Sequence, residues 1–166
     1  MIRKLMLFFI SGVMVMNCFA DSVNDFEWGW DKENNGYILN MYIGKSNKVI
    51  IPKEYDGEKV VGIGESAFAN NQLKNIEIPN SVITIGKDAF SGNQLTSLKI
   101  PNSVIKIGEV AFARNQLTNI EIPNSVTEIS GSAFFENKII KIIGQKGSTA
   151  EEYADSKKIR FIEIKE

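Results

Sequence analysis

The 166-residue chain contains no histidine and a single cysteine. Without histidine it cannot form Ser-His-Asp or Cys-His catalytic arrangements, or any zinc site with an imidazole ligand. One cysteine excludes an intramolecular disulfide and a cysteine-rich metal site. Neither charge sign dominates, because 19 basic residues stand against 20 acidic ones and the net charge is −1. This balance offers no basic excess for nucleic acid and no acidic tail, so we expect no nucleic-acid partner.

The apolar run near the N-terminus, Leu5–Met16, has only 12 residues. A bilayer span needs about 20 apolar residues, whereas a run of this length suits the core of a signal peptide. Arg3 and Lys4 precede the run, and small residues follow it in "NCFA". We therefore expect residues 1–20 to be a signal peptide, cleaved between Ala20 and Asp21. Loss of the two N-terminal basic residues would leave a mature chain of net charge −3.

A second interpretation of the same segment is lipidation. The stretch "VMNC" loosely resembles a lipobox in which Cys18 becomes the lipid-carrying first residue. Asn17 departs from that motif, which normally has Gly, Ala or Ser before the cysteine. Both interpretations predict export, and contact with a membrane is expected only if Cys18 carries lipid.

Most of the chain repeats one phrase at a fixed interval. Three units of 22 residues are closely similar and a fourth is degenerate: Val61–Val82, Ile83–Val104, Ile105–Val126 and Thr127–Ser148. A period between 20 and 50 residues predicts a solenoid, in which each coil buries its apolar side against its neighbours. Phenylalanine recurs at positions 68, 90, 112 and 134. We expect these four rings to stack in one buried column.

Each unit also predicts a short strand. In "SLKI" of the second unit, Leu98 and Ile100 are two residues apart, which places both side chains inward and Lys99 outward. Pro101 then ends the strand. Gly86 recurs in each of the three similar units, where we expect either a positive φ or a close approach of two backbones.

The repeated pattern resembles a leucine-rich repeat. Its "LxxLxI" core stands at Leu73-Ile76-Ile78, Leu95-Leu98-Ile100 and Leu117-Ile120-Ile122. More narrowly, "IGxxAFxxNxLxxLxIPxSVxxIG" resembles the BspA-like family of bacterial surface proteins, over residues 61–148 and, less closely, over Val49–Gly64 and Gly147–Ile164. One departure concerns the asparagine ladder of common leucine-rich repeats. Serine holds its usual place at positions 81, 103 and 125, and asparagines form another column at positions 71, 93, 115 and 137.

The pattern and the resemblance together predict a β-rich leucine-rich-repeat solenoid with a cap at each end. Residues 21–60 would form an N-terminal cap and an irregular first coil, residues 61–148 four repeats, and residues 149–166 a C-terminal cap. In the first cap, Phe26–Trp30 and Tyr37–Ile43 predict a hairpin around "NNG". In the second, "STAE" at Ser148–Glu151 predicts a capping box and a helix to about Lys157, followed by a strand at Ile159–Ile164.

Two short motifs resemble ligand sites without completing them. "DKENNG" from Asp31 resembles the start of an EF-hand loop, but its twelfth position is Tyr42 where a bidentate glutamate is required, so a hairpin turn is favoured. "GIGESA" resembles a phosphate loop, but the equivalent "TIGKDA" and "KIGEVA" lack the first glycine. We predict no metal, cofactor or catalytic residue. An enzyme built from Asp and Glu residues outside any motif remains a third class of function.

The strands are expected to present one line of outward side chains as a binding surface: Asn75, Glu77, Ser97, Lys99, Asn119, Glu121 and Lys141, with Ile143. Adjacent strands lie about 4.8 Å apart, so Lys99 should lie between two glutamates, as should Lys87 in the column of Glu65 and Glu109. Each column is either a charge ladder that supports stacking or a mixed-charge binding strip.

Trp28 and Trp30 likewise either cover the end of the solenoid or form an aromatic binding patch.

The resemblance implies a function in binding. It indicates an exported or cell-surface protein with a protein ligand, such as an adhesin for host matrix proteins or for other bacteria. The alternative is a structural or envelope-assembly protein of the periplasm that has no host ligand.

Overall fold

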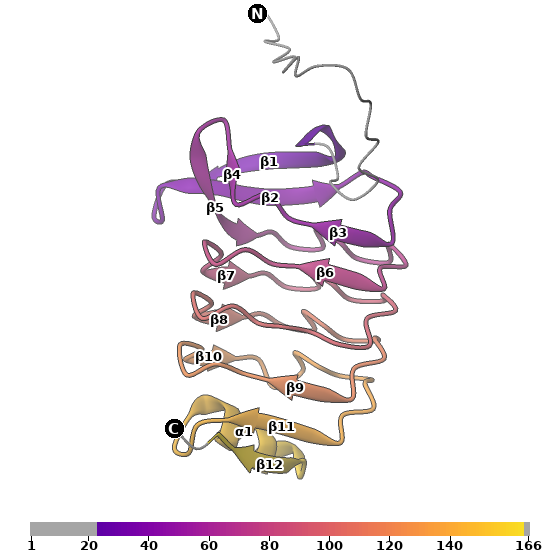
Figure 1. The fold of residues 1–166 in the computed structure, drawn as a ribbon, viewed down its shortest axis with the longest axis vertical. Coiled ribbons are helices and arrows are strands. Elements are labelled where there is room, and N and C mark those ends of the chain that lie inside the picture. Colours follow the sequence, from indigo (N-terminus) through magenta and orange to yellow (C-terminus); the bar gives the residue numbers. More distant parts are fainter. Residues whose placement is uncertain (1–22, 165–166) are drawn as a thin grey trace, which may run out of the picture.

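The computed structural model describes residues 23–164, which stack as coils along one axis (Figure 1). The elements in chain order are the 3-10 helix η1 (Val23–Asp25), β1 (Phe26–Asp31), β2 (Gly36–Tyr42), β3 (Lys48–Ile50), β4 (Glu54–Tyr55), β5 (Glu58–Ile63), β6 (Asn75–Glu77), β7 (Thr84–Ile85), β8 (Lys106–Ile107), β9 (Asn119–Glu121), β10 (Glu128–Ile129), β11 (Lys141–Gly144), α1 (Thr149–Lys157) and β12 (Arg160–Glu163). The predicted signal peptide, its cleavage site and Cys18 lie outside the described residues. No helix within residues 23–164 has the length and apolar character that crossing a membrane requires.

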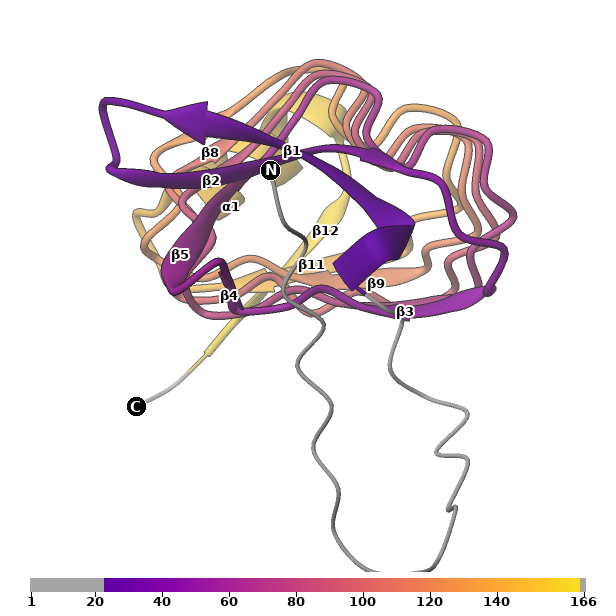
Figure 2. The ribbon, with the colours of Figure 1, turned by 90° about the horizontal axis from the view of Figure 1, so that it is seen from above.

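Short strands line two sides of the stack. One side carries a sheet in the order β1-β2-β5-β7-β8-β10, and β4 pairs with β5. The other side carries β3 beside β6, and β9 beside β11, which in turn pairs with β12. Figure 2 looks along the stack and shows the coils superposed around a common interior. The predicted leucine-rich-repeat solenoid, with a hairpin at one end and a helix and strand at the other, is confirmed.

The four repeat phenylalanines form the column that their spacing predicts. Ring centroids from Phe68 to Phe90, Phe112 and Phe134 are separated by 5.0, 5.1 and 5.5 Å, with interplanar angles of 13°, 8° and 9°. None of the four side chains is more than 3% exposed. Because each ring packs against the ring of the next coil, no single coil can bury its phenylalanine alone.

The asparagine column is a ladder in which Asn93, Asn115 and Asn137 each bond to the preceding coil; Asn93 and Asn115 are buried. The Asn93 amide donates to the carbonyl oxygens of Phe68 and Phe90 at 2.8 and 2.9 Å, and its oxygen accepts from the Leu73 amide at 2.9 Å. Asn115 repeats this pattern one coil further along. Serine at the usual position therefore does not remove the ladder; the ladder stands at the other asparagine column. These bonds satisfy backbone groups at the turns that no neighbouring strand can reach.

Each of the similar coils begins with a short strand followed by the repeat glycine. A Cβ atom at Gly86 would lie 2.9 Å from the carbonyl carbon of Gly64, so the glycine permits two backbones to approach closely. Its φ is not positive; the left-handed residue is instead Asp88, with φ of 55°. Of the two roles that the sequence left open for this glycine, the structure shows the close approach. The strands β7, β8 and β10 have two residues each. Alternation of apolar and polar residues cannot predict strands of this length from the sequence.

The N-terminal hairpin closes one end of the core. Its strands β1 and β2 pair antiparallel around a turn at residues 32–35, as predicted. Phe26 and Tyr42 are both buried, and their ring centroids lie 6.3 and 5.3 Å from that of Phe68. These two rings, rather than the tryptophans, cover the first phenylalanine of the column.

The C-terminal helix and strand close the other end. The Tyr153 ring of α1 meets Phe134 edge-on at 5.7 Å, and burial of Tyr153 raises the pKa of its hydroxyl. The predicted helix bounds are confirmed, but the predicted capping box is wrong. Ser148 Oγ donates to the Gln145 carbonyl, and the Glu151 carboxylate accepts from the Gly147 amide. The preceding turn competes for both side chains, so neither reciprocal bond of the box forms.

Candidate functional site

Outward side chains form a line down one side of the stack, which we call the strand strip. Its members are Asn75, Glu77, Ser97, Lys99, Asn119, Glu121 and Lys141; all are exposed except Lys141, which is half-buried. Backbone register places Lys141 beside Asn119, and an isolated bridge places Lys99 beside Glu121. The structure therefore brings the predicted binding residues onto one surface, although it assigns them no ligand.

The strand strip extends further than the repeat alone predicted. In β3, Lys48 and Ile50 pair with Asn75 and Glu77, so they continue the same two columns by one coil. Sequence reasoning missed them because the β4–β5 hairpin between β3 and β6 lengthens the spacing beyond 22 residues. The "IP" at Ile51-Pro52 matches the "IP" that ends each later strand and is the signal that identifies them.

The ladder of strands breaks in the second repeat. In the described part of the chain, β6 pairs with β3 alone, and residues 97–100 make a single bridge to β9. Within residues 23–164 no backbone hydrogen bond joins residues 75–78 to residues 97–100. The predicted strand at "SLKI" is therefore wrong in this repeat, although Leu98 and Ile100 point inward as expected. Leu98 stands where β6 and β9 have isoleucine, a β-branched residue that fits a strand better.

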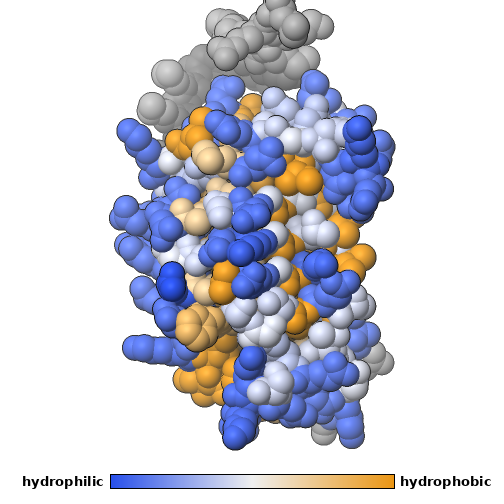
Figure 3. Space-filling model, turned by 180° about the vertical axis from the view of Figure 1, so that it is seen from behind, coloured by the Kyte–Doolittle hydropathy of each residue, from blue (hydrophilic) through white to orange (hydrophobic). Residues whose placement is uncertain are grey.

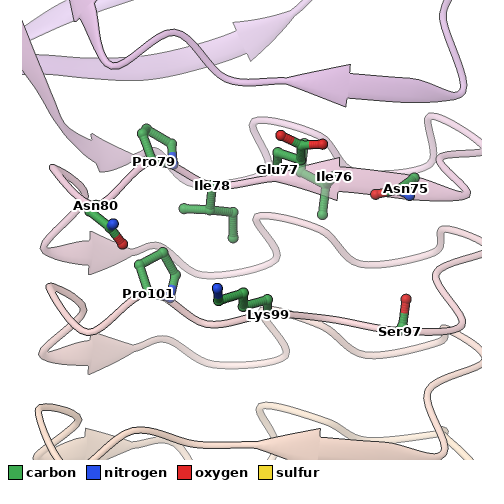
Figure 4. A pocket seen from close by; sticks show the side chains of 9 residues that line it. All are labelled: Asn75, Ile76, Glu77, Ile78, Pro79, Asn80, Ser97, Lys99 and Pro101. Atoms are coloured by element: carbon green, nitrogen blue, oxygen red, sulfur yellow. The ribbon is translucent and has the colours of Figure 1, made fainter.

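A groove opens at this break, which we call the Lys99 groove. It has a volume of about 440 Å³ and is lined by Asn75, Ile76, Glu77, Ile78, Pro79, Asn80, Ser97, Lys99 and Pro101 (Figure 4). The groove leaves Ile78 only partly buried. The equivalent side chains Ile51, Ile100 and Ile122 are 2%, 4% and 0% exposed. The groove therefore exposes an apolar surface that the other coils keep inside.

Lys99 does not form the ion pairs that its column predicts. Among the described residues, neither Glu77 nor Glu121 has a carboxylate oxygen within 4.0 Å of the Lys99 ammonium. Figure 4 shows the Lys99 side chain running toward Ile78 and Pro101, while the Glu77 carboxylate points away from it. The backbone places Lys99 beside Glu121 in the predicted column, but its side chain follows the groove, so the column does not act as a charge ladder at this coil.

The second charge column behaves closer to expectation. The Lys87 ammonium lies 3.3 Å from the Glu109 carboxylate, and this contact, with the charge of Glu65, raises the pKa of Lys87. Two further ion pairs connect successive coils: Lys106 with Glu128 at 2.7 Å, and Arg114 with Glu136 at 3.1 Å. All of these pairs are exposed, so each contributes little to stability.

Aromatic side chains also gather at the N-terminal hairpin. The Trp28 ring stacks on Tyr55 at 4.6 Å, and Tyr37 meets Tyr55 edge-on at 4.8 Å. Trp30 contacts Tyr37 at 5.1 Å and is 44% exposed. Trp28 packs against the rim of the core, which fits a cap, whereas Trp30 lies on the surface.

The acidic residue at the start of the hairpin turn, Asp31, forms hydrogen bonds within the turn itself. The Asp31 carboxylate accepts hydrogen bonds from the amide of Glu33 and from the backbone and side-chain nitrogens of Asn34, at 2.8 to 3.2 Å. The bonds from Asn34 hold the pKa of Asp31 below its ordinary value. The hairpin turn that the sequence favoured over a calcium loop is confirmed. In residues 23–164 no three metal-ligating side chains of the His, Cys, Asp and Glu types cluster together.

The BspA-type leucine-rich repeat matches residues 42–158 in six copies. The chain therefore belongs to the BspA-type leucine-rich-repeat family. The match reaches beyond the four units counted from the sequence, into the first coil and the C-terminal helix. Repeats of this type generally mediate contacts between proteins. A search of curated proteins finds no match.

Solved structures of bacterial leucine-rich-repeat proteins share the fold. A protein from Bacteroides capillosus is 26% identical with a TM-score of 0.63, over 75% of this chain and 97% of that one. One from T. pallidum is 24% identical with a TM-score of 0.59, over 75% and 71%. A leucine-rich cell surface protein from Faecalibacterium prausnitzii is 18% identical with a TM-score of 0.52, over 78% and 46%.

Proposed function

We propose that this chain is an exported bacterial protein that binds another protein through the strand strip, without catalysing a reaction. The observation that carries the proposal is the alignment of exposed polar side chains along successive coils in a family of interaction repeats. An adhesin for host matrix proteins or for other bacteria is the form of this function that the family resemblance implies.

The composition of the strip determines how it would bind. Among its residues at positions 75 to 141 there is no Trp, Tyr, Phe or Arg, the side chains that dominate many protein interfaces. Contacts would instead be made by amides, a hydroxyl and charges of both signs. We therefore expect weak affinity that falls as salt concentration rises.

Reversal of the Lys99 charge should abolish binding at the strip. Lys99→Glu would place three acidic side chains in one column, and the free energy of unfolding should fall by less than about 1 kcal/mol. Residues 21–166, immobilised and exposed to matrix proteins and to cell-envelope extract, should capture a partner that the variant does not. Lys87→Glu is the matched control, because it makes the same charge change in the other column. Equal capture by the Lys99→Glu variant would place the contact surface elsewhere.

Processing of the N-terminus provides a separate test of export. We expect the exported protein to begin at Asp21, to contain no cysteine and to show the corresponding intact mass. A diacylglyceryl mass on Cys18 would establish the lipoprotein alternative instead. Retention of residues 1–20 in the cell-associated protein would contradict both.

Surface exposure separates an adhesin from a periplasmic assembly protein. Protease added to intact cells should remove an adhesin, and the mature chain should disappear from whole-cell extracts. Survival of the chain until the envelope is opened would favour the periplasmic role, in which the strand strip would bind an envelope protein.

A further inference from the structure

We propose that the Lys99 groove binds an acidic side chain from an extended segment of the partner protein, with the carboxylate on the Lys99 ammonium. This inference rests on the proposed function of the strand strip and names the ligand chemistry that one part of the strip recognises.

The lining of the groove matches a carboxylate at the end of a short aliphatic chain. Ile78 and Pro101 form an apolar wall beside the Lys99 side chain (Figure 4). A carboxylate binds strongly to an ammonium, and the asparagine and serine side chains of the lining supply further hydrogen-bond donors. The methylene groups of a glutamate would pack on the wall while its carboxylate meets Lys99.

Charge complementarity favours an acidic ligand at this coil and at no adjacent one. The positions equivalent to Lys99 in the neighbouring coils are Glu77 and Glu121, so this is the one cation of its column between residues 76 and 122. Its ammonium is engaged by neither glutamate. A ligand that covers the groove would exclude water from the new ion pair and so strengthen it.

The broken ladder favours an extended ligand. β6 has β3 on one side only, and residues 97–99 make one bridge on the side away from β6. The backbone on both sides of the groove therefore lacks the ladder bonds that the paired strands make. The coils remain joined on either side of the break, where the Gln94 amide donates to the Leu73 carbonyl and the Ile105 amide to the Ile83 carbonyl, both at 2.8 Å. The groove therefore admits one side chain of the ligand, whose extended main chain would run across the groove opening. A volume of about 440 Å³ suits a short segment rather than a folded surface.

Two other surfaces of the molecule give weaker support for a ligand site than the Lys99 groove does. Figure 3 shows apolar surface along the face opposite to the strand strip, but nothing in the structure indicates what would cover it. Trp30 is 44% exposed, and a cavity near its hairpin is lined by charges of both signs, Lys53, Glu54 and Lys59, which favour no single ligand charge. The Lys99 groove is the site where shape, charge and unpaired backbone coincide.

The test uses a blocked pentapeptide, acetyl-Thr-Val-Glu-Val-Thr-amide, and its glutamine counterpart, titrated into ¹⁵N-labelled residues 21–166. We expect amide signals of residues 75–80 and 97–101 to shift with the glutamate peptide. The glutamine peptide should bind at least about fivefold more weakly, because it lacks the charge-assisted bond. Acetate is the third probe and should shift these signals only slightly. Equal affinity of both peptides, or equal shifts with acetate, would overturn the proposal.

Three variants assign the binding to the groove. Lys99→Met keeps the aliphatic stem and should weaken the glutamate peptide at least about fivefold. Asn80→Asp should weaken it as well, because the new carboxylate repels the ligand and competes for Lys99. Lys87→Met makes the same charge change on the other column and should leave the affinity unchanged. Equal losses from both lysine variants, or no shift of the groove signals, would overturn the proposal. The capture experiment tests the proposed function of the strand strip, and the peptide titration tests the Lys99 groove. A negative result in one experiment therefore does not decide the other.

Discussion

Phe112→Ala should lower the free energy of unfolding by about 3–5 kcal/mol, the usual range for truncation of a large core side chain. Phe112 is fully buried, and its ring lies 5.1 Å from Phe90 and 5.5 Å from Phe134. Neighbouring coils cannot close the resulting cavity without losing their own stacking. Urea denaturation of residues 21–166, followed by circular dichroism, measures the difference.

Phe135→Ala is the matched control for this truncation. Phe135 follows the last ring of the column in sequence but is 55% exposed. The same substitution there should change the free energy of unfolding by no more than about 0.5 kcal/mol. If both variants cost the same, the phenylalanine column does not hold the coils together.

Asn93→Ala should cost about 2–5 kcal/mol, because several buried backbone groups lose their hydrogen-bond partner at once. The side chain donates to two carbonyl oxygens of successive coils and accepts from the amides of Asn71 and Leu73 at 3.1 and 2.9 Å. Asn93→Asp should also destabilise, since a carboxylate has the same shape but presents no donor to the carbonyl oxygens. This second variant separates loss of hydrogen bonds from loss of packing.

Asn71→Ala is the control for the ladder. Asn71 begins the column, and among residues 23–164 its side chain donates to the Ala69 carbonyl alone, at 3.3 Å. We expect a loss of about 1 kcal/mol or less, the net value of one ordinary hydrogen bond. Equal losses at the two positions would contradict the ladder as a set of contacts between coils.

Features that depend on the 22-residue period could be predicted from the sequence. Stacking of the four phenylalanines follows from the period, because a residue repeated once per coil must occupy the same place in every coil, and their apolar rings place this column in the core. The outward line from Asn75 to Lys141 follows from the same rule combined with alternation in a strand. The hairpin from Phe26 also has a local signal in its turn.

Features that depend on how two coils differ could not be predicted. The repeat treats Leu98 as equivalent to Ile76, so it predicts a strand where the ladder in fact breaks. The groove, the partial exposure of Ile78 and the free Lys99 ammonium all follow from that break. The prediction of a capping box at Ser148 was wrong for a related reason. The four-residue pattern does not include the preceding turn, whose backbone groups form the competing hydrogen bonds with Ser148 and Glu151.

Hydrogen–deuterium exchange of residues 21–166 with and without the captured partner tests the central claim most directly. The claim is that the strand strip is the contact surface. We predict slower exchange in β3, β6, residues 97–100 and β9 when the partner is bound, and unchanged exchange at the turns across the stack. Protection confined to β1 and β2, or to the turns at residues 88–92 and 110–114, with unchanged exchange in β6 and residues 97–100, would contradict it.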